Sequence, residues 1–314
     1  MTERPQRFAS LQGWIRRRGP GTLPSLLRLL LVALAFTFAA QTSVASAWCQ
    51  ARDRVSGVGG CVQPCIEEGL ALHWTRPCID YTVHESGARD LDDVLVFGVL
   101  DRSFASWTSI DCGGRGLGFD VQRRGERTRW EGPAYVSGEG NTNQFEFVDE
   151  EWSERGHSAG AFALTTTWFS LSDGTILDAD MEINEQHWGW AVCPDAGCTD
   201  GNVDLENTIT HELGHFFGLA HTPDDEDATM WACADEGETL KRTLETDDAE
   251  GGCAIYPEGA LEGTCSFEPR GGFARFPGDD GCGCRAPGTG GSTAPLGFAI
   301  ALLALVIHRR RRRP

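Results

Sequence analysis

The spacing of apolar residues along the middle of the chain predicts three helices. Residues 91–110 carry apolar side chains at positions 91, 94, 95, 99, 100, 104 and 107. This spacing of three to four residues predicts a long helix with one face in the core. Val203 to Leu219 predicts a second helix, and a third is expected to begin near Asp247.

Four other segments favour strands. Residues 74–84 are rich in β-branched and aromatic side chains, and Pro77 within them favours an edge position or an irregular start. Residues 144–148 and 161–171 are also predicted strands, and residues 176–183 alternate apolar and acidic positions as a half-buried strand does. The order of strand, helix, several strands and two helices predicts one α+β (layered α/β) domain of about 200 residues.

The N-terminal end differs from this middle part. An apolar run at residues 29–40 follows a cluster of arginines and precedes Ala45-Ser46-Ala47, which has the small-residue pattern of a signal-peptidase site. We therefore predict a signal peptide over residues 1–47 and a folded domain over residues 48–258. A membrane anchor is the alternative, but the run is much shorter than the roughly 20 residues that a span needs.

The C-terminal end predicts a tether and a sorting segment. Residues 259–293 contain cysteines and much Gly and Pro, and residues 294–314 combine an apolar run with five consecutive arginines, 309–313. Such a run is short for a stable span, so a transient sorting signal and a permanent anchor both stay open. Gly281-Cys282, the apolar run and the arginines together resemble the MYXO-CTERM type of tail. That resemblance implies processing at the cell envelope, with the sorting machinery as a partner.

Charge narrows the choice of partners for the exported part. The whole chain has 27 basic and 46 acidic residues, and the ends outside 48–285 hold eleven arginines and one glutamate. The remainder therefore has 16 basic against 45 acidic residues, with Lys241 as its one lysine. Nucleic acid and anionic lipid are excluded as partners on this ground. We expect a monomer.

The cysteines predict disulfides. Ten of them lie between residues 49 and 265, behind the export signal, where oxidised pairs are the rule. Cys193 with Cys198, and Cys233 with Cys253, are the pairs that sequence proximity suggests. The full connectivity cannot be deduced from the sequence.

The stretch HELGHFFGLAH, residues 211–221, predicts a metal site. His211 and His215 lie four residues apart, so on a helix their imidazoles can reach one zinc ion. On a continued helix His221 would lie about 15 Å further along the axis. Gly218 can adopt the left-handed conformation that ends a helix and turns the chain back, which would bring His221 to the same ion.

Glu212 is the predicted general base. Three neutral nitrogens leave a fourth zinc position for water, as in catalytic sites. Glu212 follows the first ligand by one residue, so its carboxylate can flank the metal, take a proton from the water and pass it to the leaving amine. The other histidines before the tail, His73, His84, His157 and His187, lack such spacing and are expected to be surface or hydrogen-bonded side chains.

This stretch resembles the metzincin zinc motif, with Met230 as the Met-turn. The matrixin-like branch fits best, on Asp178-Ala179-Asp180, Asn184 and Trp188, and on residues 244–248 and 255–257. The resemblance covers residues 72–257. It implies a twisted, mostly parallel sheet with a long first helix, an active-site helix and a C-terminal helix after the Met-turn. It also implies substrate along an edge strand, for which 161–170 is the candidate.

Departures from the family are few. Thr222 replaces the usual serine, and no tyrosine follows Trp231, which argues against the astacin branch. The latency cysteine motif is absent, and its nearest counterpart is residues 76–80. Family members often bind structural calcium, for which Asp173, Asp178 and Asp180 supply oxygen ligands. Solvated acidic residues on a strand and turn are the favoured alternative for these three.

The sequence therefore predicts an exported zinc endopeptidase at the cell surface or in the medium. Two alternatives remain: a surface binding or adhesion module that keeps zinc without turnover, and a zinc amidase acting on the envelope. The intact Glu212 counts against the first, and only substrate chemistry separates the second.

Overall fold

The computed structural model describes residues 48–54, 59–136, 141–265, 267 and 299–302. The predicted signal peptide and most of the predicted tether and tail lie outside these residues. The helices are α2 (Asp93–Thr108), α3 (Leu205–Phe216) and α4 (Thr246–Ile255), with a 3₁₀ turn at Leu240–Arg242. The strands are β1 (Cys49–Gln50), β2 (Cys78–Val83), β3 (Asp120–Arg123), β4 (Asn143–Val148), β5 (Ala163–Phe169), β6 (Ile176–Asn184), β7 (Trp190–Ala191), β8 (Val203–Asp204), β9 (Leu219–Ala220) and β10 (Ala299–Leu302).

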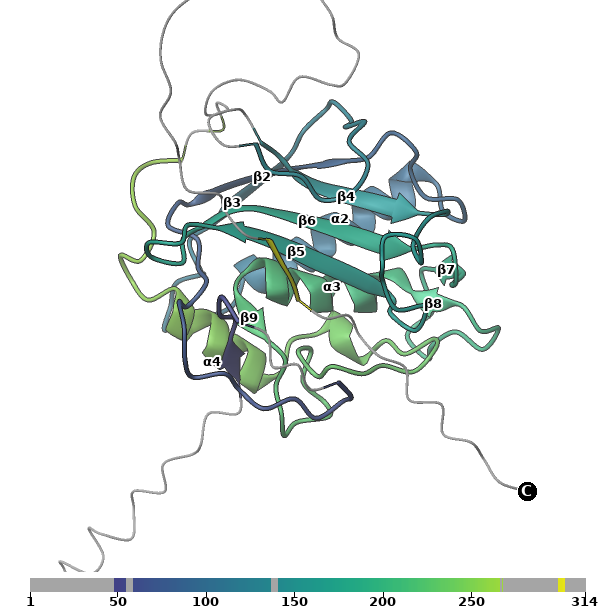
Figure 1. Cartoon of the computed structure of the whole chain (residues 1–314). Helices are drawn as coiled ribbons and strands as arrows, with labels where there is room; N and C mark the ends of the chain where they lie inside the picture. The colour runs from purple at the N-terminus through teal and green to yellow at the C-terminus, as the bar shows by residue number, and fades with distance from the viewer. Residues whose placement is uncertain (1–47, 55–58, 137–140, 266, 268–298, 303–314) are drawn as a thin grey trace, which may run out of the picture. The chain divides into compact units, whose positions relative to one another are not determined.

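A twisted sheet in the order β10-β5-β6-β4-β2-β3 forms the main layer (Figure 1). Strands β3, β2, β4 and β6 run parallel, and β5 is antiparallel to β6. The predicted mostly parallel α+β architecture is therefore correct. Strand β2 begins at Cys78, directly after Pro77, so the proline marks an irregular start as expected. The edge position was wrong, because β3 covers the outer side of β2.

Helix α2 begins where Asp92 caps it, since the Asp92 side chain accepts a hydrogen bond of 2.9 Å from the Leu95 amide. Its buried positions are Val96, Val99, Leu100, Ser103, Phe104 and Trp107. The predicted helix is confirmed, but its first turn was placed wrongly in the core. Val94 is 80% exposed, because the buried face begins one residue after Leu95.

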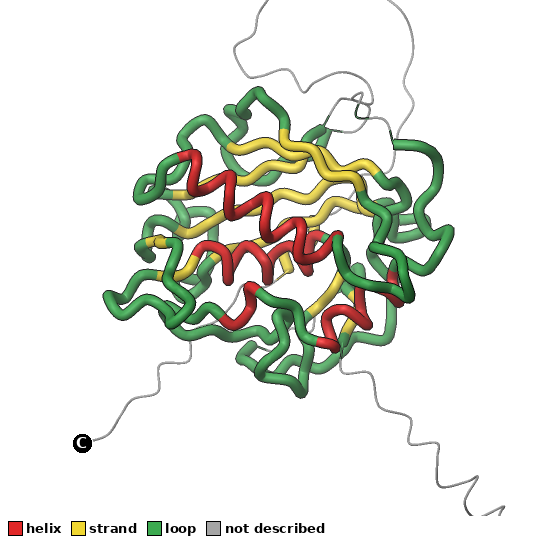
Figure 2. Tube along the Cα trace, turned by 180° about the vertical axis from the view of Figure 1, so that it is seen from behind, coloured by secondary structure: helices red, strands yellow, loops and turns green. Residues whose placement is uncertain are grey.

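An aromatic core joins the sheet to α2 and α3, which lie on the same side of it (Figure 2). The Phe104 ring of α2 stacks on Tyr81 of β2 with ring centroids 4.9 Å apart. It also meets Phe216 of α3 edge-on at 5.7 Å. These contacts set the distance between α3 and the sheet. They thereby set the position of the histidines that α3 carries.

Strand β6 differs from the half-buried strand that its alternation predicts. Asp178, Asp180 and Glu182 are all buried, each at most 3% exposed. Glu182 has a partner in Arg155, whose guanidinium donates to Glu182 (2.7 Å) and to Glu146 of β4 (2.8 Å). The acidic residues alternate as predicted, but the segments before β4 and before β5 cover the face that was expected to meet water, over Asp180 and Glu182 respectively.

Five disulfides join all ten cysteines between residues 49 and 265. The pairs are Cys49–Cys65, Cys61–Cys233, Cys78–Cys265, Cys112–Cys253 and Cys193–Cys198. The predicted Cys193–Cys198 pair is confirmed, and the suggested Cys233–Cys253 pair is wrong. Each of those two cysteines bonds a residue more than 140 positions earlier in the sequence. Five disulfides are typical of proteins that fold in an oxidising compartment outside the cytoplasm.

Within the described ranges, no helix combines the length and apolar character needed to cross a membrane.

Candidate metal centre

Helix α3 carries the first two histidines of the motif. Its N-terminus is capped by Asp204, which accepts a hydrogen bond of 2.8 Å from the Asn207 amide. Arg242 donates to both oxygens of the same carboxylate, at 2.6 and 2.8 Å. His211 and His215 lie one turn apart on this helix, and both are buried.

The chain reverses its direction at Gly218, and this reversal brings His221 back beside α3. Helix α3 ends at Phe216, and Gly218 has a φ of 89°, in the left-handed region that glycine tolerates. A Cβ atom there would lie 2.5 Å from the Leu72 carbonyl oxygen, so a larger residue does not fit. Strand β9 then pairs antiparallel with β1 and leads to His221. The helix is shorter than the predicted 203–219, but the reversal occurs at the expected glycine.

The three imidazoles each turn their Nε2 atom toward a common point. His221 Nε2 lies 3.3 Å from His211 Nε2 and 3.1 Å from His215 Nε2. Among the described residues, these three form the one cluster of His, Cys, Asp and Glu with ligand atoms close enough to hold a metal ion. The three side chains are 0%, 1% and 6% exposed, so the cluster is largely shielded from water.

The opposite ring nitrogen of each histidine faces an oxygen. His211 Nδ1 lies 2.6 Å from the Thr229 carbonyl, and His215 Nδ1 lies 2.9 Å from the Leu219 carbonyl. Because a carbonyl only accepts, both Nδ1 atoms carry the proton. Burial lowers the pKa of His215 to about 4 and that of His211 well below its usual range, so both rings are neutral. Their Nε2 lone pairs therefore point into the space between the rings.

This arrangement fits zinc. Two nitrogens bound tetrahedrally at about 2.0–2.1 Å from zinc are about 3.3 Å apart, close to the separations found here. Lone pairs that face one another in a buried space repel, and a cation between them removes that repulsion. Three neutral nitrogens are also a donor set that zinc accepts while keeping a further coordination position.

Glu212 lies beside the cluster and contacts the sheet. Its Oε2 accepts a hydrogen bond of 2.7 Å from the Thr165 hydroxyl of β5. Its Oε1 is buried and has no hydrogen-bond partner within the described protein. Burial raises the pKa of Glu212 to about 8, and a nearby cation would favour the ionised form. One carboxylate oxygen is thus held by the protein, and the other is left to bind water or substrate.

Met230 packs against the helix that carries His211 and His215, beside Gly214. A Cβ atom added to Gly214 would lie 2.0 Å from the Met230 sulfur, so the glycine makes room for the thioether. The adjoining turn is held by Asp248 of α4, whose carboxylate accepts from the amides of Thr229 (2.8 Å) and Met230 (3.0 Å). Asp248 therefore supports the carbonyl that orients His211.

Comparison with known protein families gives one match. Residues 73–257 match the family model described as Matrixin, of the Peptidase_M10 group, and this span contains α2, the strands β2 to β9, α3 and α4. The chain belongs to the matrixin family. This is a family of metalloproteases, so the chain carries a metalloprotease domain. A search of curated proteins found no match to the chain.

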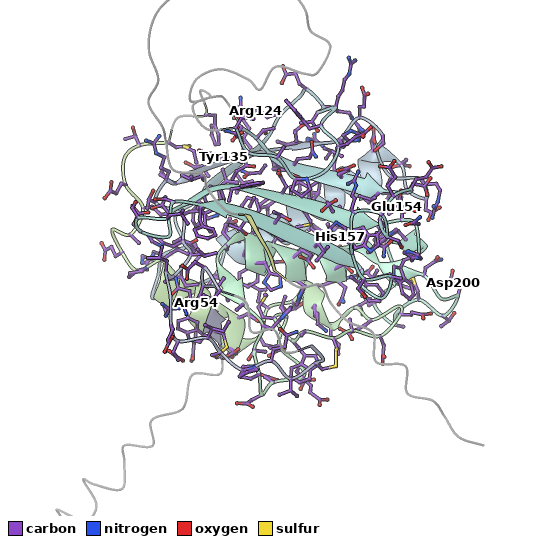
Figure 3. All side chains as sticks on the ribbon, in the orientation of Figure 1. Arg54, Arg124, Tyr135, Glu154, His157 and Asp200 are labelled. Carbon is purple, nitrogen blue, oxygen red and sulfur yellow. A yellow bond between two sulfur atoms is a disulfide. The ribbon has the colours of Figure 1, made fainter. Side chains whose placement is uncertain are left out.

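The other four histidines of the matrixin domain lie outside the cluster. His73 contacts the Ala71 carbonyl (3.1 Å), His84 the Ser86 hydroxyl (2.8 Å), His157 Glu182 (3.1 Å), and His187 Ser153 (2.9 Å). Figure 3 places His157 beside the sheet, where it shares Glu182 with Arg155. All four are hydrogen-bonded, as the sequence led us to expect. Cys78, within the counterpart of the latency motif, is bonded to Cys265 and has no free thiol.

The three aspartates considered for calcium do not form one site in this matrixin. Asp173 is exposed, and hydrogen bonds from the Thr175 amide and nearby hydroxyls lower its pKa to about 2. Asp178 and Asp180 are buried, so the alternative of solvated acids is wrong for these two. Asp180 accepts from the amides of Ala134 and Gln144, both at 2.9 Å.

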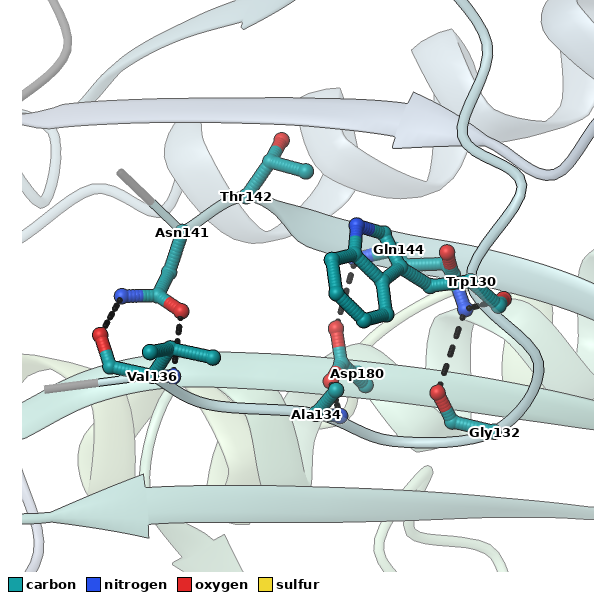
Figure 4. Close-up of a pocket in the computed structure, with 8 residues that line it drawn as sticks. All are labelled: Trp130, Gly132, Ala134, Val136, Asn141, Thr142, Gln144 and Asp180. Atoms are coloured by element: carbon teal, nitrogen blue, oxygen red, sulfur yellow. Dashed lines mark hydrogen bonds between the residues drawn. The ribbon is translucent and has the colours of Figure 1, made fainter. Parts of the chain in front are cut away.

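Asp180 also lines a hollow of about 330 Å³ between β4, β6 and the segment before β4, part of it open to solvent (Figure 4). Asp180 and Gln144 are turned toward the backbone that frames this hollow. Gln144 donates its backbone amide proton to Asp180 and its side-chain NH₂ to the Trp130 carbonyl, and Asp180 is the one acidic residue among the described residues that line the hollow.

Three residues near the histidines were missed by the sequence reasoning. Thr165 lies in the predicted substrate strand, but nothing in a run of three threonines distinguishes it from its neighbours. Asp248 belongs to a segment that resembles the family, without a signal for its hydrogen bonds. Gln63 contacts His221 from 158 positions earlier in the chain, which no local pattern reveals.

Proposed function

We propose that this chain is an exported zinc endopeptidase in which His211, His215 and His221 hold the metal and Glu212 is the general base. The observation that carries the proposal is the convergence of three Nε2 atoms, two of them 3.1 and 3.3 Å from the third. Membership of the matrixin family supports the same activity.

The histidines, Glu212 and Thr165 would each have a different role in the proposed hydrolysis. A zinc ion held by the histidines would supply Lewis acidity, which lowers the pKa of water and polarises a peptide carbonyl. Glu212 would accept the proton of the attacking water at Oε1, the oxygen without a protein partner, and deliver it to the leaving nitrogen. Thr165 would hold the other oxygen and so keep the carboxylate facing the reaction.

Strand β5 is the proposed docking edge for substrate. Its Thr165 contacts Glu212, so a peptide paired with β5 would pass beside the general base. Strand β10 pairs antiparallel with Thr165–Trp168, which supports an extended chain as the occupant of this edge. Addition of a strand supplies backbone hydrogen bonds without demanding one side-chain sequence, so we expect broad recognition of unfolded segments.

The proposed location is outside the cytoplasm, on the cell envelope or in the medium. The five disulfides support an oxidising compartment. The excess of acidic residues between 48 and 285 favours solubility and disfavours adhesion to anionic surfaces.

The test compares the full chain with Glu212→Gln, measuring bound zinc and the cleavage of an unfolded protein substrate. The variant should keep stoichiometric zinc and lose on the order of 10²–10⁴-fold in kcat, the usual contribution of a general base. Glu206→Gln is the matched control on the same helix, because Glu206 pairs with Arg102 away from the cluster. It should retain activity.

Three results would contradict the proposal. Undiminished cleavage by Glu212→Gln would remove the general base, and a wild type without zinc would remove the ligand assignment. A zinc-loaded wild type that leaves proteins intact would favour a binding module, or an amidase if it hydrolyses envelope amides instead.

A further inference from the structure

The third histidine has a side-chain partner from the N-terminal part of the domain. His221 Nδ1 lies 3.1 Å from Oε1 of Gln63. The other two histidines use backbone carbonyls at this position. Gln63 is 8% exposed and His221 is 6% exposed, so water competes little for this contact.

The Gln63 amide is oriented by a second hydrogen bond. Its Nε2 donates to the Gly60 carbonyl at 3.1 Å. The nitrogen end of the amide is therefore occupied, and the oxygen end faces His221. An amide oxygen only accepts, so His221 carries its proton on Nδ1 and presents the Nε2 lone pair to the other two rings.

Two disulfides hold the segment that carries Gln63. Cys61, two residues before Gln63, is bonded to Cys233, which follows the Met230 turn. Cys65, two residues after it, is bonded to Cys49 of β1. Strand β1 pairs with β9, the strand that ends directly before His221. The residues around Gln63 are thus tied to both segments that flank the third histidine.

We infer that Gln63 is a positioning residue for the metal site, which fixes the tautomer and ring orientation of His221 from a loop clamped by Cys61–Cys233 and Cys49–Cys65. This inference rests on the proposed zinc ligation and adds to it a residue outside the HELGHFFGLAH motif. A hydrogen-bonded partner on the far nitrogen of a ligand histidine raises the basicity of the ligand and reduces the freedom of its ring. Loss of such partners typically weakens metal affinity by about 10–100-fold.

The decisive measurement is the zinc dissociation constant of the full chain, obtained by competition with a chromophoric chelator. Gln63→Leu keeps the approximate size of the side chain and removes the acceptor. It should weaken zinc binding by about 10–100-fold. Gln63→Glu supplies a carboxylate oxygen to the same Nδ1 proton and should bind zinc as tightly as the wild type, or more tightly. Urea unfolding of the metal-free proteins shows whether each variant folds.

Gln186→Leu is the matched control. Gln186 accepts a hydrogen bond of 3.1 Å from the Ser153 amide, and no described hydrogen bond connects it to the histidines. Its zinc affinity should equal that of the wild type. Unchanged affinity in Gln63→Leu would overturn the inference, as would a Gln63→Glu protein that is folded but binds as weakly as Gln63→Leu.

A wild type that binds no zinc would contradict the proposed function itself, and this inference with it. Stoichiometric zinc in the wild type with equal affinity in Gln63→Leu would contradict the role of Gln63 alone. If Gln63→Leu does not fold, the zinc affinity of Gln63→Glu is compared with that of the wild type instead. We expect equal or tighter zinc binding, because the carboxylate still accepts from His221 Nδ1. Weaker zinc binding by a folded Gln63→Glu protein refutes the inference.

The clamp is tested by a double-mutant cycle. Replacing both Cys61 and Cys233 with Ala should weaken zinc binding, because the Gln63 loop is then freed at one end. Adding Gln63→Leu to that protein should cost less than in the wild type, since the loop no longer holds the acceptor in place. Fully additive losses would show that the disulfide does not act through Gln63.

Discussion

The hydroxyl of Thr165 donates a hydrogen bond of 2.7 Å to Oε2 of Glu212, which joins strand β5 to the helix that carries His211 and His215. The same hydroxyl lies 3.2 Å from the Glu212 backbone carbonyl. The strand proposed to dock substrate and the proposed general base are therefore connected directly.

Thr165→Val should lower kcat while leaving zinc content unchanged. Hydrogen bonds to charged groups contribute about 1.5–3 kcal/mol, so we expect a loss of roughly tenfold to a hundredfold, measured on a peptide substrate. Thr167→Val is the matched control on the same strand, because the Thr167 hydroxyl is buried and has no hydrogen-bond partner in the part of the chain that the structure describes. Equal rates for the two variants would show that the contact with Glu212 has no catalytic importance.

Arg155→Met should strongly destabilise the fold. Arg155 lies between the buried carboxylates of Glu146 and Glu182, and its removal leaves Glu146 without a cation and Glu182 with the His157 ring alone. Breaking a buried ion pair in this way costs about 3–5 kcal/mol, measured by urea unfolding. Arg129→Met breaks the exposed pair with Glu85 and should cost less than about 1 kcal/mol. Similar values for both variants would contradict a buried role for Arg155.

The buried pair Asp178 and Asp180 should give the fold a distinctive pH dependence. Burial, reinforced by the charge of Asp180, raises the pKa of Asp178 well above its usual value. Asp178 therefore keeps its proton in the folded protein but loses it on unfolding at any pH above the ordinary value near 4. The folded state binds the extra proton, so the free energy of unfolding falls as pH rises from about 4 toward the raised pKa.

Asp178→Asn removes this titration, because asparagine stays neutral. The variant should gain stability relative to the wild type as the pH rises above about 5 toward the raised pKa of Asp178, by up to about 1.4 kcal/mol per pH unit. Asp173→Asn is the control: hydrogen bonds lower the pKa of this exposed carboxyl to about 2, so it stays ionised in both states over that range. A difference between wild type and Asp178→Asn that does not change with pH would be evidence against the raised pKa.

Strand β10 should compete with substrate for the outer edge of β5. It pairs Ile300 with Thr167 and Ala301 with Thr166, on the strand that contacts Glu212 (the yellow strand in Figure 1). Proline at positions 300 and 301 removes the amide protons that such pairing uses. We expect a lower KM for a peptide substrate and an unchanged kcat, because a site that is occupied part of the time binds with reduced apparent affinity.

A proline at Val306, beyond the described strand, is the control for the change in tail sequence and should leave KM unchanged. An equal KM for the wild type and the variant with prolines at 300 and 301 would mean that β10 does not obstruct the edge.

The sequence predicted those features that depend on residues close together along the chain. His211, His215 and Gly218 lie within eight positions, so helix geometry and the conformational freedom of glycine were enough to place them. The buried stripe of α2 was predicted in the same way, except at Val94 and Leu95, which are exposed because the buried face begins only at Val96.

Contacts between distant segments could not be predicted in this way. The burial of Asp178 depends on chain segments that cover β6, and alternation alone gives no measure of that cover. Cys233 could be paired with its neighbour Cys253 by proximity, although its partner is 172 positions away. Gln63 was missed for the same reason, because only the folded chain brings it to His221.

The long sequence separations of the disulfides set the order in which this enzyme can mature. On the proposed export route, Cys49 and Cys65 reach the oxidising compartment early and can pair there, but Cys233, the native partner of Cys61, arrives much later. A wrong bond among these first three thiols is the immediate hazard, and thiol exchange is the remedy. On the export route proposed above, the Cys61–Cys233 bond that holds the Gln63 loop can form only after almost the whole domain has been translocated, so the proposed metal centre is completed outside the cytoplasm.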